Sequence, residues 1–268
     1  MLPIMHIKIH KYTGMKRRLS HVIVGLFFLF LFLYLNVSPS SRPQVSTCDL
    51  SKWVVLLTTA VQVNVGEPVK EKNTSIPEVR ISLYNEAFKK WWTHTSMNIV
   101  IVENSGFGFE EIRSYAPSVE IDSFKMPYVP KKVSMAEAYS IVHAFDNHYL
   151  DSYEFVLKVT GKYFLPDIEQ YLCSLNATVP DFDLLIQSKP SHCEVFGFRK
   201  YLTHHIWLPI IRRVGVSKNG DTESELIALR TNPERNMYYG QKLTHKQLPR
   251  IKLLKPIQRA WGDWMEDI

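Results

Sequence analysis

Three glycine-containing motifs that mark common nucleotide-binding and hydrolytic folds are missing from this sequence. No G-x-G-x-x-G follows the first predicted strand, and no G-x-x-x-x-G-K-[ST] occurs anywhere in the chain. These absences disfavour a dinucleotide-binding domain and a P-loop NTPase. No G-x-S-x-G elbow is present either, so an α/β hydrolase is discarded as well.

Metal-site spacing is also missing. His192, Cys193, His204 and His205 lie near one another in the sequence, but they form no Cys-x₂-Cys or His-x₃-His pattern. The adjacent His204 and His205 point in different directions on either a helix or a strand. We therefore predict that these residues do not ligate zinc.

Acidic residues are absent from the first 20 residues, which hold five of the 32 Lys and Arg. The remaining residues carry 27 Lys and Arg against 26 Asp and Glu, so they are nearly neutral. A nucleic-acid partner is disfavoured, because an excess of one positive charge is too small to match a phosphate backbone. At 46% hydrophobic and 22% charged, the composition also excludes wholesale disorder and fibrous repeats.

An uninterrupted apolar run, VIVGLFFLFLFLYL, covers residues 22–35. Such a run is either the core of a cleaved signal peptide or a short signal anchor. No A-x-A cleavage site follows it, and the basic segment before it is long, which favours an anchor over 21–37. The basic flank predicts a cytosolic tail at 1–20 and a lumenal remainder, beginning with a Ser/Pro-rich stem at 38–52. We expect a single-pass type II protein of the Golgi or ER membrane.

Sequons and cysteines agree with a lumenal domain. Asn73 and Asn176 are the expected glycosylation sites, each in a polar context. In an oxidising lumen Cys173 and Cys193 could close a 20-residue loop, which would leave Cys48 to link two chains as a homodimer. Three free thiols are the alternative.

Strands and helices alternate along residues 53–188. Apolar, β-rich runs predict strands at 53–63, 98–106, 119–125, 154–159 and 183–188. Helical spacing predicts helices at 79–95, 110–116, 134–150 and 166–175. In the third helix, Ser134 is the expected N-cap and Glu137 completes a capping box. The alternation predicts an α/β domain over 53–268, with a mostly parallel sheet, helices on both faces and a ligand site at the carboxyl ends of the strands.

The pattern resembles a type II Golgi glycosyltransferase with the GT-A fold, a Rossmann-like sheet that binds nucleotide sugars. The resemblance covers roughly residues 53–200. It is carried by VVLLTTAVQVN, by IVIVENSGFGFEEI and by SMAEAYSIVHAFDNHYLDSYEFVLKVTGKYFLPDIEQYL. KVTGKYF is the most specific piece, similar to the K-[ILV]-[ST]-G-[RK]-Y motif of one subset of these enzymes.

The sequence departs from this family at the metal-binding Asp-x-Asp, because Thr160-Gly161-Lys162 stands in that place. Lys162 and the amide groups around Gly161 could bind the donor diphosphate in place of a metal. A role for Mn²⁺ or Mg²⁺ stays possible as an alternative, because Asp181-Phe182-Asp183 is an Asp-x-Asp motif. This motif enters a strand, however, and is better explained as a turn.

The resemblance and the strand ends together predict the donor site. In the family, the positions of Glu103 and Asn104 contact the base or ribose; a turn that satisfies its own backbone is the alternative for these two residues. Arg80 is a candidate phosphate ligand and also fits a structural surface role. The full set of expected donor-binding residues is Thr58, Arg80, Glu103, Asn104, Lys158, Gly161, Lys162 and Tyr163.

Candidate catalytic carboxylates lie further along the chain. Glu223 and Glu225 fall in the first turn of a predicted helix, where the family places its base, although Thr222 and Glu225 also fit a capping box. Asp263, between two tryptophans, is a third candidate. The sequence thus predicts transfer of a sugar from a nucleotide-sugar donor to a glycan, protein or lipid acceptor. The alternative is a non-catalytic, transferase-like lumenal protein that binds glycan or a partner enzyme.

Overall fold

The structure is a computed structural model. It describes residues 48–62, 76–175, 182–187, 194–212, 229, 232 and 236–248, together with the backbone of 252–258 and 264–267. All of these belong to one compact unit, Arg42–Ile268. The predicted tail, anchor and sequons at Asn73 and Asn176 lie outside the described residues. Of the helices that the structure does describe, none combines the length and the apolar character needed to cross a bilayer.

A seven-stranded sheet in the order β3-β2-β1-β4-β6-β5-β9 forms the centre of the unit. The neighbours β3, β2, β1 and β4 pair in parallel, whereas β6 runs antiparallel between β4 and β5. The strands are β1 (Trp53–Thr59), β2 (Asn98–Glu103), β3 (Glu120–Ser123), β4 (Phe155–Thr160), β5 (Leu184–Ile186), β6 (Val195–Arg199) and β9 (His245–Gln247).

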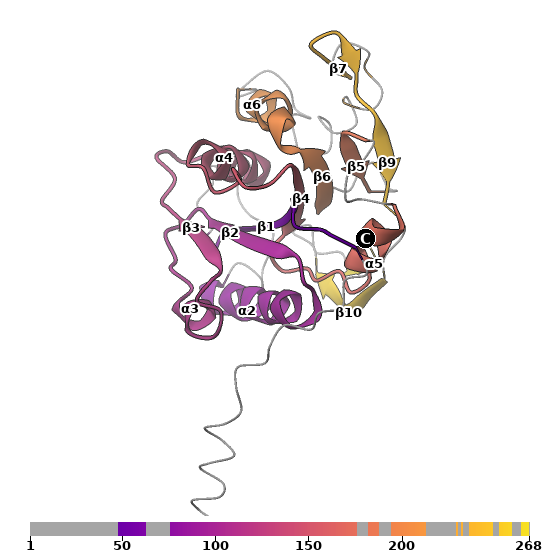
Figure 1. The fold of residues 1–268 in the computed structure, drawn as a ribbon. Helices are drawn as coiled ribbons and strands as arrows, with labels where there is room; N and C mark the ends of the chain where they lie inside the picture. Colours follow the sequence, from indigo (N-terminus) through magenta and orange to yellow (C-terminus); the bar gives the residue numbers. More distant parts are fainter. Residues whose placement is uncertain are drawn as a thin grey trace, which may run out of the picture. The chain divides into compact units, whose positions relative to one another are not determined.

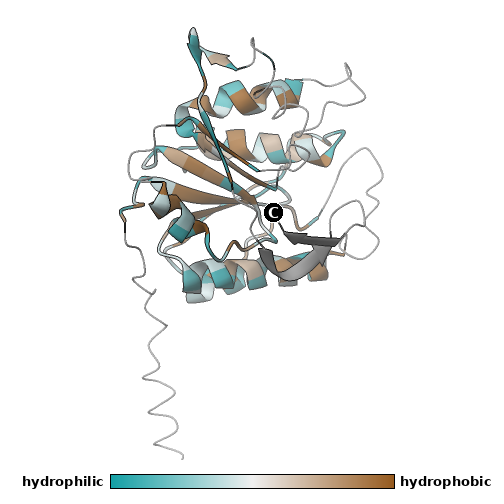
Figure 2. Cartoon of the chain, turned by 90° about the vertical axis from the view of Figure 1, so that its right-hand side faces the viewer, coloured by the Kyte–Doolittle hydropathy of each residue, from teal (hydrophilic) through white to brown (hydrophobic). Residues whose placement is uncertain are grey.

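Helices cover both faces of this sheet (Figure 1). One face packs against α2 (Pro77–His94), α3 (Glu110–Tyr115) and α5 (Ile168–Ser174). The other packs against α4 (Val133–Asp146), the 3₁₀ turn η1 (Lys200–Leu202) and α6 (Thr203–Arg212). Figure 2 shows the apolar residues concentrated in the strands between these two layers, as expected for strands that are buried on both sides. The predicted α/β class with a mostly parallel sheet is confirmed.

Two short two-stranded sheets follow. β7 (Met237–Tyr238) pairs antiparallel with β8 (Gln241–Lys242) as a hairpin, and β10 (Lys252–Gln258) pairs antiparallel with β11 (Trp264–Asp267). In the first, the left-handed backbone of Tyr239 and Gly240 closes the turn.

The disulfide joins Cys48 to Cys173, so the predicted Cys173–Cys193 pair is wrong. The two Cα atoms are 5.6 Å apart, although 125 residues separate them in the sequence. Because the Cys48 sulfur is used within the chain, a homodimer linked through Cys48 is not supported. Cys193 lies outside the described residues.

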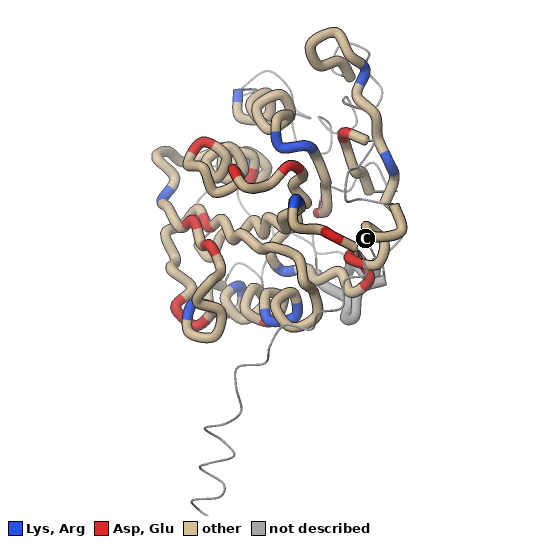
Figure 3. Tube along the Cα trace, in the orientation of Figure 1, with Lys and Arg blue, Asp and Glu red and all other residues tan. Residues whose placement is uncertain are grey.

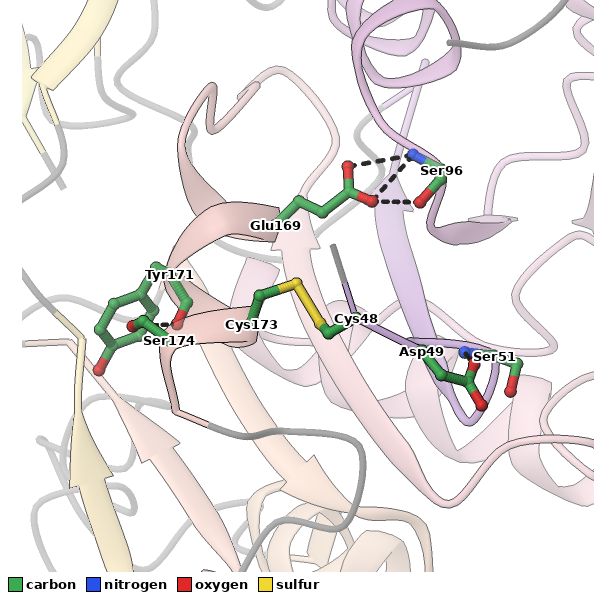
Figure 4. Close-up of a disulfide and its surroundings, with 8 residues drawn as sticks. All are labelled: Cys48, Asp49, Ser51, Ser96, Glu169, Tyr171, Cys173 and Ser174. Carbon is green, nitrogen blue, oxygen red and sulfur yellow. Dashed lines mark hydrogen bonds between the residues drawn. A yellow bond between two sulfur atoms is a disulfide. The ribbon is translucent and has the colours of Figure 1, made fainter. Parts of the chain in front are cut away.

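Figure 4 shows how this disulfide fastens the segment ahead of β1 to α5. Beside it, the carboxylate of Glu169 on α5 accepts hydrogen bonds from the backbone N–H of Ser96 at 3.1 and 3.3 Å. Leu50, between Cys48 and β1, is buried in the core, so the last residues of the predicted stem pack with the domain.

Candidate functional site

A cleft of about 460 Å³ lies at the carboxyl ends of β1, β2 and β4. The strand order reverses here, because β2 and β3 lie on one side of β1 and β4 on the other. Open α/β sheets bind ligands at such a switch point. Residues of α2 and α4 and of the segment between β3 and α4 complete its walls.

A buried polar cluster forms the floor of this cleft. The Lys158 ammonium lies 2.8 Å from the Glu137 carboxylate, and the Lys158 side chain is 0% exposed. Thr58 donates its hydroxyl to the same carboxylate at 2.7 Å, and Thr160 lies 3.4 Å from it. Three elements, β1, β4 and α4, therefore meet at one carboxylate.

The predicted capping box around Glu137 is wrong. Helix α4 begins at Val133 after Lys132, and no side chain caps it. Glu137 turns toward the sheet instead, where its carboxylate supplies a counter-charge to the buried ammonium of Lys158. Among the described residues that line the cleft, Glu137 is the one carboxylate, and sequence reasoning did not assign it to the site.

Arg80 and Tyr84 form one wall from α2. The Arg80 guanidinium donates to the carbonyl of Ala60 at 3.1 Å and to the Tyr84 hydroxyl at 3.2 Å. The Tyr84 hydroxyl donates to the same carbonyl at 3.2 Å, and burial is the main cause of its raised pKa. The spacing of these two residues, one helical turn apart, brings both to the end of β1.

Asn104 lines the cleft, whereas Glu103 lies beneath it. The Asn104 amide donates to the Ser140 hydroxyl on α4 at 2.9 Å. Glu103 is fully buried, and its carboxylate accepts from the backbone N–H groups of Val61 at 2.9 Å, Ser105 at 2.9 Å and Phe107 at 2.7 Å. In this structure Glu103 therefore fixes the turn after β2, and Asn104 is the one of the two that faces the cleft.

The Thr-Gly-Lys turn after β4 is packed against the end of β1. The Gly161 N–H donates to the carbonyl of Thr58 at 2.8 Å, so it is engaged within the protein. A Cβ at Gly161 would come within 2.4 Å of Thr59 Cγ2, which explains the glycine. Lys162 lies with its ammonium 5.6 Å from the ring centroid of Tyr163, and Tyr163 is buried. Of this motif's residues, Thr160 is the one that lines the cleft.

A second cation and several apolar side chains form the opposite rim. Lys125 is exposed there, and Tyr128, Val129 and Val133 line the same rim with exposed fractions of 40%, 55% and 46%. Behind them, Phe124 stacks on His143 with ring centroids 3.7 Å apart, and His143 pairs with the buried Asp122 at 2.9 Å. Burial raises the pKa of Asp122. These contacts fix the base of the rim segment.

The predicted catalytic residues Glu223, Glu225 and Asp263 lie outside the described residues. Asp183 is described and lies just ahead of β5, where its carboxylate accepts from the Thr244 N–H at 2.9 Å, as a strand-start residue would. Within the described part of the chain, no three His, Cys, Asp or Glu side chains are grouped closely enough to hold a metal ion. Figure 3 shows acidic and basic residues interspersed over the same part.

No protein-family model matches the chain, and no curated protein does. Several solved structures are similar in fold. One, from Desulfovibrio desulfuricans, is assigned as a nucleotide-diphospho-sugar transferase and is 16% identical, with a TM-score of 0.46 over 75% of this chain and 80% of the other. Residues 1–349 of S. aureus TarS are 12% identical, with a TM-score of 0.41 over 65% and 55% of the two chains. A 4-diphosphocytidyl-2C-methyl-D-erythritol synthase from Anaerococcus prevotii is 11% identical, with a TM-score of 0.40 over 75% and 89%.

Proposed function

We propose that this chain is a glycosyltransferase that holds a nucleotide-sugar donor in the switch-point cleft and transfers the sugar to a glycan, protein or lipid acceptor. The cleft carries the proposal, because it combines hydroxyl, amide and carboxylate groups on its floor with Arg80 and Lys125 on its walls. A nucleotide sugar needs both kinds of group. Its hydroxyls need hydrogen-bond partners, and its diphosphate needs positive charge.

In this proposal the walls and the floor of the cleft bind different parts of the donor. Arg80 and Lys125 neutralise the negative charge that grows on the leaving diphosphate. Glu137 and Asn104 form hydrogen bonds with donor hydroxyls, and the pairing of Glu137 with Lys158 holds that carboxylate in place. Removal of the acceptor proton is assigned to Glu223 or Glu225, with Asp263 as a further candidate; this assignment stays a prediction.

A metal clamp in the cleft would need several oxygen ligands from the residues that line it. Mn²⁺ and Mg²⁺ prefer several oxygen ligands, usually from more than one carboxylate. Among the described residues the cleft offers Glu137 alone, already paired with Lys158, so these residues do not fit a metal clamp. No step of the proposal therefore passes through a metal.

The proposed location is the Golgi or ER membrane, with residues 21–37 as anchor and 38–268 in the lumen. The basic residues ahead of the apolar run support this orientation. The Cys48–Cys173 disulfide supports an oxidising compartment, because disulfides rarely persist in the cytosol.

A non-catalytic, glycan-binding protein is the second candidate. Its supporting observation is that the cleft's one described carboxylate is tied to a lysine, at a site where transfer chemistry commonly uses a metal-bound pair.

A donor panel tests the choice between them. The Tm of the full chain in detergent would be measured with UDP-, GDP- and CMP-sugars, each in the presence of Mn²⁺ and of EDTA. Hydrolysis of each donor would be measured under the same conditions. We expect one donor class to raise the Tm and to be hydrolysed slowly in EDTA. Hydrolysis with Mn²⁺ alone would show that a clamp lies among residues outside those described. A Tm unchanged by every donor would favour the non-catalytic candidate.

A further inference from the structure

Three tyrosines gather beside the β7–β8 hairpin, away from the cleft lining. Tyr201 of η1, Tyr238 of β7 and Tyr239 of the turn are called the tyrosine platform here. Their rings follow one another, with centroids 5.4 Å apart from Tyr201 to Tyr238 and 4.5 Å apart from Tyr238 to Tyr239. Tyr239 is 91% exposed and Tyr201 49%.

The turn that carries Tyr239 has a backbone conformation that disfavours a tyrosine. Tyr239 has a φ of 47° and Gly240 a φ of 80°, so both central residues of this two-residue hairpin are left-handed. Such turns favour Asn-Gly or Asp-Gly, and a bulky residue in the first position is strained. Tyr239 is almost fully exposed, so its contact with Tyr238 covers little of its surface. A strained and exposed aromatic residue points to a role outside folding.

Hydrogen bonds hold the rings of Tyr201 and Tyr238 in place, and about half of the Tyr201 surface stays exposed. The Tyr201 hydroxyl donates to Asp183 at 2.7 Å, and the Tyr238 hydroxyl donates to the carbonyl of Tyr201 at 3.3 Å. Burial, together with the bond to Asp183, raises the pKa of Tyr201 to about 12. Asp183 also accepts from Thr244, which follows the hairpin. Tyr201 and Tyr238 are therefore preorganised, which lowers the entropic cost of binding.

We propose that the tyrosine platform binds a pyranose ring of a glycan. The C–H face of a pyranose is weakly positive and apolar, and it complements the negative face of an aromatic ring, while tyrosine hydroxyls can meet sugar hydroxyls at the edge. The size of the patch favours this ligand over a protein. A stable protein interface takes about 800 Å² and 20–30 residues from each partner. Around this hairpin, Met237 is the one further large apolar side chain exposed among the described residues.

This site does not depend on transfer chemistry, so it can be tested without a nucleotide. The full chain, in a detergent without a sugar head group, would be studied by saturation-transfer NMR with lactose, maltose, α-mannobiose and N,N′-diacetylchitobiose. At least one of these is expected to receive saturation. Tyr239→Asn should weaken its binding roughly 3- to 10-fold, as expected when an aromatic contact is lost.

The same substitution separates binding from folding. Asn-Gly suits the turn, so Tyr239→Asn should leave the Tm unchanged or raise it. Ile76→Ser removes an exposed apolar side chain ahead of α2, on the opposite side of the sheet, and should leave sugar binding unchanged.

Three results would overturn the proposal. The first is no saturation transfer to any of the four disaccharides. The second is unchanged sugar binding in Tyr239→Asn; a lower Tm in the same variant would make the ring a folding element. The third is a dimer in sedimentation velocity that Tyr239→Asn dissociates, which would make the platform a contact between copies. Donor-induced stabilisation of the cleft is measured separately, so failure of the donor proposal and failure of this one are distinguishable.

Discussion

The ammonium of Lys158 lies 2.8 Å from the carboxylate of Glu137, and this pair joins β4 to α4 beneath the cleft. The Lys158 side chain is fully buried, while that of Glu137 is 17% exposed. A buried ammonium carries a large desolvation cost unless a counter-charge and hydrogen bonds accompany it. Glu137 therefore has a structural role and, because it lines the cleft, faces any ligand bound there.

We expect Glu137→Gln to lower the free energy of unfolding by about 3 kcal/mol, because it removes the carboxylate that pairs with the buried Lys158 ammonium. The double variant Glu137→Leu/Lys158→Met should recover most of that loss, since it removes both charges. Urea unfolding, analysed by linear extrapolation, measures both values.

The matched control is Glu86→Gln. Glu86 pairs with Lys90 at the same 2.8 Å on the surface of α2, with 45% of its side chain exposed. Exposed pairs contribute less than about 1 kcal/mol. If Glu137→Gln cost no more than Glu86→Gln, burial would not govern the energetics of the Lys158 pair.

Gly161→Ala should destabilise the protein by about 1–3 kcal/mol, the usual cost of overpacking. The new Cβ would lie 2.4 Å from Thr59 Cγ2 and 3.0 Å from the carbonyl of Thr58. Thr59→Ser removes the first of these atoms and keeps the hydroxyl that donates to Val102. The double variant Gly161→Ala/Thr59→Ser should therefore recover part of the stability that Gly161→Ala loses, as measured by thermal unfolding. If the two stability losses simply added, the clash with Thr59 would be contradicted.

The position of the cleft was predictable from the sequence because its signals are local. Buried parallel strands appear as continuous apolar runs, and polar residues such as Thr58 and Asn104 follow them directly. Parallel strand ends meet at one edge, so these residues were expected together. The structure does bring Thr58, Arg80 and Asn104 to the cleft lining.

The missed features depend on contacts that are distant in the sequence. Glu137 fits a capping box by spacing, and only the packing of α4 on the sheet shows that it lies beside Lys158. Distance in the sequence favours Cys193 as the partner of Cys173, whereas the disulfide joins Cys173 on α5 to Cys48 ahead of β1. Periodicity predicts a strand but not its place in a sheet, so the insertion of β6 between β4 and β5 had no sequence signal.

Loss of the disulfide should be costly. Cys48→Ser and Cys173→Ser should each lower the free energy of unfolding by roughly 2–5 kcal/mol, because the bond closes a long loop in the unfolded chain. Cys193→Ser should have a small effect, since Cys173 is already bonded to Cys48. Peptide mapping without reductant identifies the bond directly, and a Cys173–Cys193 peptide would contradict this structure.

Lys125→Ala should weaken binding of the stabilising nucleotide sugar by about 10-fold, the usual contribution of a hydrogen bond to a charged group. The loss should shrink at high salt, because Lys125 is exposed. Lys89→Ala removes an exposed lysine on α2 that does not line the cleft and serves as the control. Equal losses from both variants, measured by calorimetric titration, would indicate a general charge effect without a phosphate contact at Lys125.

Asp183 should make the stability of the protein depend on acid pH. Burial alone would raise the pKa of Asp183, but hydrogen bonds from Thr244 and Tyr201 and the charge of Arg199 outweigh burial and hold that pKa below 3.8. A carboxyl with a lowered folded-state pKa stabilises the fold at pH values above its unfolded pKa, and this contribution is lost as the pH falls through the folded-state value. Asp183→Asn should therefore lower stability by roughly 1–2 kcal/mol at neutral pH, through weakened hydrogen bonds, and by less as the pH falls below 3.8. Thermal unfolding of both proteins from pH 7 to pH 3 measures this difference. A difference that stays constant over the whole range would mean that Asp183 acts through its shape and not through its charge.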